Sequence, residues 1–125
     1  MHMVSVVAAL ALLEYLAISL LTGRARATYG VQAPATVGHP TFERWYRVQH
    51  NTIEQLVIFL PSLFLFATYV SPRWASILGL VFIVGRALYA RGYIADPAGR
   101  GPGFLTGFAA TVVLLLGGLF GALFA

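Results

Sequence analysis

Cysteine and lysine are both missing from this chain of 125 residues, and charge of either sign is scarce. The lack of cysteine excludes disulfides, thiolate metal sites and a cysteine nucleophile. All eight basic residues are arginines, and charged residues make up only 10% of the chain. The formal net charge of +4 is small and scattered, and no basic run is interleaved with aromatic residues. We therefore expect no nucleic-acid partner.

Apolar side chains are what the sequence has in abundance. They make up 59% of the residues, and the mean hydropathy is +0.83. A soluble globular domain is about half apolar and about a quarter charged. The composition therefore predicts an integral membrane protein in contact with membrane lipids.

Four stretches of the chain are long enough to cross a bilayer, which takes about 20 mostly apolar residues. Ser71-Pro72 separates the second stretch from the third, and the Gly- and Pro-rich run 96–103 separates the third from the fourth. The expected spans are approximately residues 3–23, 41–70, 74–93 and 104–125. The sequence thus predicts an all-α protein in which residues 1–125 form a single four-helix membrane domain.

The first span also invites comparison with a secretory signal peptide. Ala25-Arg26-Ala27 imitates a cleavage site with small residues on both sides. However, Glu14 interrupts the apolar stretch, and no lysine or arginine precedes it. We therefore expect the first span to remain part of the protein.

The distribution of arginines predicts the orientation in the membrane. The loop between the second and third spans carries Arg73 alone, and no arginine precedes the first span. The other loops and their approaches carry Arg24, Arg26, Arg44, Arg47, Arg91 and Arg100. Because positive residues accumulate in cytoplasmic loops, we expect the first and third loops in the cytoplasm and both termini outside.

A charged and polar run, residues 42–54, passes directly into the apolar second span. Within it, Arg47, Asn51 and Glu54 stand at i, i+4 and i+7, which places them on one stripe of a helix. Ionisable groups at membrane depth are costly unless paired, so by default they mark a functional site. This face suits a small polar ligand that is charged at both ends.

A second polar cluster ends the third span. Arg86, Tyr89 and Tyr93 again share one helix stripe, and Arg100 follows in the third loop. Guanidinium groups suit carboxylates and phenols donate hydrogen bonds, so the two clusters together fit a zwitterionic peptide. Interhelical polar contacts and interfacial aromatics offer a purely structural alternative. Two clusters on one side of the membrane favour the ligand site.

The two clusters together resemble the signature of the MAPEG family, the membrane-associated proteins in eicosanoid and glutathione metabolism. The matching patterns are Glu43-Arg44-x-x-Arg47-x-Gln49-x-Asn51-x-x-Glu54 and Arg86-x-x-Tyr89-x-x-Gly92-Tyr93. The number and order of the helices also match, so the resemblance covers nearly the whole chain. It implies a homotrimer that binds glutathione between neighbouring subunits at the cytoplasmic side, as a co-substrate and without a metal.

The resemblance also implies roles for individual residues. Arg100 occupies the place of the arginine that activates the thiol, which makes it the expected catalytic residue. The residues expected to bind glutathione are Arg26, Arg47, Gln49, Asn51, Glu54, Arg86, Tyr89 and Tyr93. The implied function is a glutathione transferase or peroxidase that acts on lipophilic electrophiles or lipid hydroperoxides.

Other functions stay open at this point. A small multidrug exporter also has four helices and uses a lone glutamate in its first helix, where Glu14 lies. A non-catalytic, lipid-binding member of the same family is a second alternative. A metal site is not expected, because the spacing of His39, Glu43 and His50 matches no closed set of ligands.

Overall fold

The computed structural model contains four long helices joined by short connections. Each of the four is long and apolar enough to cross a membrane. Their bounds are α1, His2–Thr28; α2, Pro40–Tyr69; α3, Pro72–Ala95; and α4, Gly101–Leu123, which follows a short 3₁₀ helix, η1, over Pro97–Arg100. The prediction of an all-α membrane protein with four spanning helices is confirmed.

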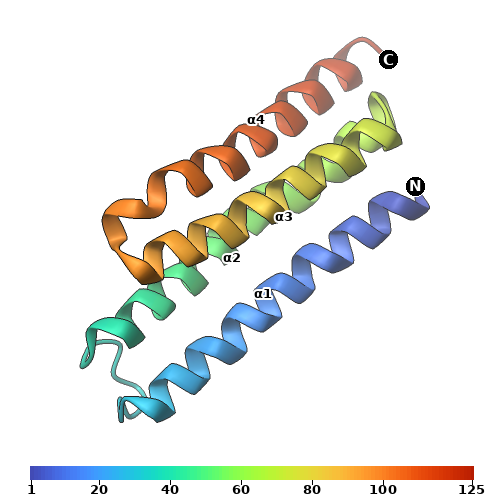
Figure 1. The fold of residues 1–125 in the computed structure, drawn as a ribbon. Helices are drawn as coiled ribbons and strands as arrows, with labels where there is room; N and C mark the ends of the chain where they lie inside the picture. The colour runs from blue at the N-terminus through green and yellow to red at the C-terminus, as the bar shows by residue number, and fades with distance from the viewer.

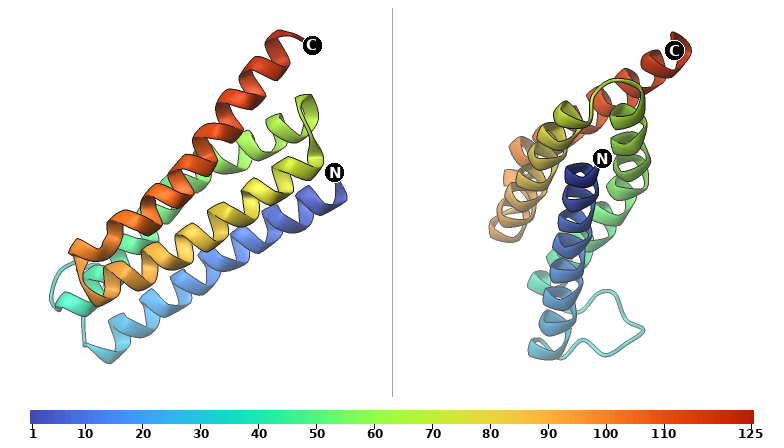
Figure 2. Two further views of the ribbon diagram at one scale, coloured as in Figure 1. Left: turned by 45° about the horizontal axis from the view of Figure 1, so that its top comes forward. Right: turned by 90° about the vertical axis from the view of Figure 1, so that its right-hand side faces the viewer.

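The helices alternate in direction along the bundle. α1 and α3 run one way, and α2 and α4 run the other way (Figures 1 and 2). Both termini therefore lie at one end, and the α1–α2 loop and η1 lie at the opposite end (Figure 1). This second end carries the polar clusters that the sequence places on α2 and α3, and we call it the loop end.

The helix boundaries follow from local chemistry. The imidazole of His39 accepts a hydrogen bond from the Thr41 amide at 3.2 Å, and the Ser71 hydroxyl accepts one from the Trp74 amide, also at 3.2 Å. Side-chain acceptors of this kind satisfy amides that a helix start leaves free. The first span was expected to end near residue 23, but α1 continues to Thr28. Residues 24–28 contain two alanines and two arginines, which favour a helix, and no proline. The chain turns instead at Gly30, whose φ of 66° suits glycine.

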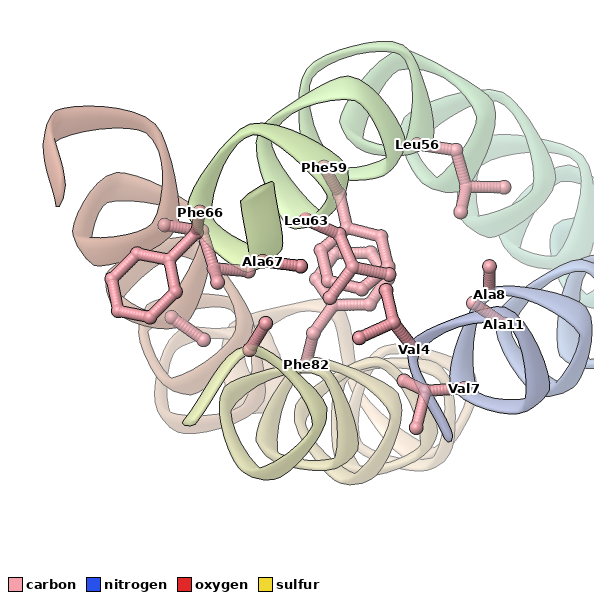
Figure 3. Packing of buried hydrophobic residues seen from close by; sticks show 13 residues of the cluster. Val4, Val7, Ala8, Ala11, Leu56, Phe59, Leu63, Phe66, Ala67 and Phe82 are labelled. Carbon is pink, nitrogen blue, oxygen red and sulfur yellow. The ribbon is translucent and has the colours of Figure 1, made fainter. Parts of the chain in front are cut away.

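The largest apolar core lies toward the end that carries the termini. Val4 and Val7 of α1 meet Leu63 of α2 in this core (Figure 3). The rings of Phe59 and Phe82 stack with their centroids 3.8 Å apart. Many large apolar side chains elsewhere remain exposed on the single chain, as expected for a surface that faces lipid or another subunit. The polar clusters of α2 and α3 therefore lie at the loop end, apart from this apolar core.

Glycines bring α3 and α4 unusually close together. A Cβ atom added at Gly103 would overlap the backbone nitrogen of Tyr89, and one added at Gly85 would come within 2.6 Å of the Gly107 nitrogen. Small residues are what allow membrane helices to approach with their backbones nearly in contact. We call this contact the glycine seam, defined by Gly85, Gly103 and Gly107. It fixes the start of α4 beside the last turns of α3.

Candidate functional site

A cavity of about 580 Å³ opens at the loop end of the bundle. Its size is in the range of sites for small molecules. The lining comes from α2, α3, η1 and α4, and consists of Arg47, Asn51, Tyr89, Tyr93, Arg100, Gly101, Phe104 and Leu105. This lining holds cations and hydrogen-bond donors but no carboxylate or imidazole, so it suits an anionic ligand better than a metal ion.

The α2 wall of the cavity is formed by Arg47 and Asn51. Arg47 is exposed and has no acidic partner within the chain, so its guanidinium is free to meet a ligand. The side-chain oxygen of Asn51 accepts a hydrogen bond from Nη2 of Arg86 at 2.8 Å. That bond fixes which way the amide points: its oxygen lies toward α3, and its nitrogen remains available as a donor.

Arg86 lies behind the cavity rather than in its lining. Its side chain is only 1% exposed, although it carries a full charge. Nη2 donates to Asn51 and also to the hydroxyl of Thr52 at 2.8 Å. The guanidinium carbon lies 4.2 Å from the centroid of the Tyr89 ring, within the range of a cation–π contact. Arg86 thus supports one residue on each of two cavity walls.

Aromatic rings and Arg100 complete the cavity on the α3 and α4 side. The Tyr89 ring lies 5.7 Å from that of Tyr93 and 6.2 Å from that of Phe104, measured between centroids. Arg100 is exposed at the end of η1, where Nη1 donates to the Pro97 carbonyl at 2.6 Å. This bond anchors one nitrogen of the guanidinium and leaves other N–H groups directed to a ligand or to water.

Besides Arg86, which lies behind the cavity, three more of the residues expected to bind glutathione lie outside its lining in a single chain. Glu54 follows Asn51 on the exposed face of α2. Gln49 faces α1, where its amide nitrogen donates to the Ser19 hydroxyl at 3.3 Å. Arg26 donates to the carbonyls of Val31 at 3.3 Å and Ala35 at 2.7 Å. Gln49 and Arg26 are therefore directed to the α1 side of α2, away from the cavity.

Some residues that shape the site were given no role from the sequence. Arg44 donates to the carbonyls of Ile94 at 2.9 Å and Ala95 at 3.3 Å, which ties the start of α2 to the end of α3. Those carbonyls belong to the last turn of a helix, where no partner is available within the helix. Phe104 begins the apolar part of α4 and looks like any lipid-facing residue in the sequence. Thr52 lies one turn after Val48 and one turn before Leu56, so the apolar stripe of α2 is the sequence signal that would have predicted its burial.

Known proteins resemble this chain over most of its length. The sequence model of the MAPEG family matches residues 4–120. An uncharacterized protein of Synechocystis sp. is 49% identical over 115 residues, which cover 92% of this chain and 84% of that protein. Microsomal glutathione S-transferase 2 of Homo sapiens is 39% identical over 103 residues, or 82% of this chain and 70% of the human protein. Leukotriene C4 synthase of Cavia porcellus is 40% identical over 75 residues, or 60% and 50% of the two chains.

Proposed function

Because the chain belongs to the MAPEG family, we propose that it is a membrane-embedded transferase that uses glutathione as its co-substrate. The name of the human relative, a microsomal glutathione S-transferase, supports this activity. The observation that carries the proposal is the cavity at the loop end. There, two arginines, an amide and two tyrosine hydroxyls converge on a space of about 580 Å³.

The lining matches the chemistry of glutathione, a tripeptide with two carboxylates and one ammonium group. Arg47 is free to pair with a carboxylate, since a guanidinium binds this group through two parallel hydrogen bonds. Asn51 and the hydroxyls of Tyr89 and Tyr93 then donate to peptide or carboxylate oxygens. Arg86 does not line the cavity, but its contacts hold Asn51 and Tyr89 in place.

We propose that the protein is a homotrimer with its ligand between subunits, and the distribution of the remaining residues supports a site shared by two chains. In one chain, Arg47 and Asn51 lie on the cavity side of α2, whereas Gln49 and Arg26 lie on the α1 side. One chain therefore cannot place all of them around one ligand. A neighbouring subunit whose α1–α2 side meets the cavity supplies the missing contacts, and exposed Glu54 then becomes available to the ammonium group of glutathione.

The proposed chemistry begins with ionisation of the thiol by Arg100. The thiol proton passes to water, and the guanidinium stabilises the thiolate that remains. The thiolate sulfur then forms a bond to an electrophilic carbon while the leaving group departs with its electron pair. With a lipid hydroperoxide, the thiolate sulfur takes the distal oxygen and becomes a sulfenic acid, and the alkoxide takes a proton from water and leaves as the alcohol. A second glutathione then yields the disulfide and water. The lipophilic substrate reaches the sulfur from the bilayer past Phe104 and Leu105, the apolar part of the lining.

Glutathione binding is the direct test. Calorimetric titration of the solubilised protein should show saturable binding that weakens about tenfold in Arg47→Ala, the typical loss for one charge-assisted contact. Arg73→Ala is the matched control, because Arg73 lies at the opposite end of the bundle and should leave the affinity unchanged. A wild-type protein without saturable binding would rule out the proposed function.

We further propose that the cavity faces the cytoplasm and that both termini lie outside. The natural absence of cysteine makes this testable with single-cysteine variants at two exposed positions, Val70→Cys between α2 and α3 and Ala98→Cys in η1. A membrane-impermeant maleimide should label the first variant in intact cells and the second only after permeabilisation. The opposite labelling pattern would reverse the assigned orientation.

A further inference from the structure

Two buried polar side-chain atoms make no hydrogen bond in this structure. They are Oε1 of Glu14 in α1 and Nε of Arg86 in α3. Buried polar groups are nearly always paired, and an unpaired charge in a low-dielectric interior is especially costly. It is therefore informative that the two atoms belong to groups of opposite charge.

The register of α1 and α3 places these two residues opposite each other. The two helices run in the same direction (Figure 1), and a Cβ atom at Gly79 of α3 would overlap the side chain of Val7 of α1. Moving seven residues along both helices is close to two full turns, so it keeps the same faces and the same level. It leads from Val7 to Glu14 and from Gly79 to Arg86.

A second contact between α1 and α3 lies on the far side of Glu14 and Arg86. Ile18 of α1 packs with Tyr89 of α3 in a small buried cluster, about one turn beyond Glu14 and Arg86. Glu14 and Arg86 carry opposite charges, so they attract each other across this interface. Arg86 is also the only charged side chain in the buried core, so nothing else in that core offers Glu14 an opposite charge.

We propose that Glu14 is the counter-charge of Arg86 and, through it, a positioning residue for the glutathione site. This inference rests on the proposed function. Glu14 holds the guanidinium on the α1 side, while Nη2 holds Asn51 and Thr52, and the face of the group lies on the Tyr89 ring. In this proposal, the charge of Glu14 on α1 acts through Arg86 on two walls of the cavity. Glu14 itself touches no ligand.

The neutral partners of Arg86 explain why a carboxylate is needed. Asn51 and Thr52 accept hydrogen bonds from the guanidinium but do not balance its charge. With Glu14 neutralised, the buried cation is left uncompensated and shifts toward water or toward the ligand. Asn51 and Tyr89 then lose the geometry that suits glutathione. The same pairing argues against a free, transport-type carboxylate at Glu14.

The first test is Glu14→Gln, which keeps the size of the side chain and removes its charge. With 1-chloro-2,4-dinitrobenzene as the electrophile, KM for glutathione should rise about tenfold, within the usual range of coupling between contacting residues. The turnover number should change by less than about twofold, because Arg100 and the thiol are untouched. Tyr15→Phe removes the neighbouring hydroxyl from α1 and should leave both constants unchanged. An unchanged KM in Glu14→Gln overturns the inference.

A double-mutant cycle with Arg86→Gln covers the case in which a single variant folds poorly. If the two residues form a pair, each single variant leaves one buried charge alone, whereas the double variant leaves none. The double variant should therefore be recovered as folded protein in higher yield than either single variant. A yield at or below that of the worse single variant overturns the pairing. A wild-type protein that binds no glutathione instead overturns the proposed function and, with it, the positioning role.

Discussion

Arg100→Ala should lower turnover about 25-fold at pH 7 and weaken glutathione affinity only about fourfold. A free thiol with a pKa of about 8.5 is about 3% ionised at pH 7, whereas one whose pKa is lowered to about 6.5 is about 75% ionised. The ratio of these fractions gives the expected loss. Affinity changes little because Arg47, Asn51 and the tyrosines still line the cavity.

The pH dependence provides the sharper measurement. Arg100 favours the charged thiolate and therefore lowers the pKa of the bound thiol, so its removal shifts the rise of activity to higher pH. The deficit of Arg100→Ala should be largest below about pH 6.5 and should nearly vanish above about pH 9.5, where both thiols are ionised. The absorbance of bound thiolate near 240 nm reports the same titration without turnover.

Two arginine variants serve as controls for this experiment. Arg91→Ala removes an exposed guanidinium near the end of α3. Because Arg91 does not line the cavity, the variant should show the same pH dependence of activity as the wild type. Arg100→Lys keeps the positive charge and should retain part of the activity. A uniform loss of rate at all pH values in Arg100→Ala would show that the residue acts on something other than thiol ionisation.

Gly103→Ala should destabilise the folded protein by about 3 kcal/mol, at the upper end of the range for overpacking. The added methyl group would meet the backbone of Leu88 and Tyr89, which cannot move aside as a flexible side chain does. α4 must then withdraw from α3. Since Phe104 and Arg100 are carried by the start of α4 and the preceding η1, the cavity should widen along with the loss of stability.

Thermal or denaturant unfolding in detergent measures this effect, and Gly23→Ala is the matched control. Gly23 lies in α1 with nothing within 4 Å of an added Cβ atom. Alanine there should stabilise the helix by about 0.5–1 kcal/mol, the opposite sign. Equal stability of Gly103→Ala and wild type would mean that the glycine seam is looser than the structure has it.

Much of the fold could be predicted from the sequence, since long apolar runs and prolines determine where membrane helices start and stop. The convergence of Arg47, Asn51 and Arg100 on one end also followed from their positions at helix ends that the topology brings together. The end of α1 was harder to place, because Arg24 and Arg26 continue the helix beyond the apolar run. Hydropathy marks where the membrane ends, whereas helix propensity marks where the helix ends.

The parts of the site that could not be predicted depend on contacts distant in sequence. Arg86 shares a stripe with Tyr93, but spacing cannot say whether that stripe faces a cavity or a neighbouring helix. In the structure, Arg86 faces α2 and Tyr93 lines the cavity. Arg26 is held by carbonyls of the loop after α1, whose path depends on how the chain reverses at Gly30. The spacing of residues along a helix does not predict such a contact with a loop.

The glycine seam makes the geometry of the candidate site largely independent of the outer surface of the bundle. Because backbone atoms of α3 and α4 meet directly there, the place of Arg100 relative to Tyr89 depends little on the large side chains of the outer surface. Exposed residues such as Val84 and Leu116 are then free to change with the thickness or composition of the membrane. Such changes on the outer surface would suit the protein to a different lipid environment, while Gly85 and Gly103 tolerate almost no replacement.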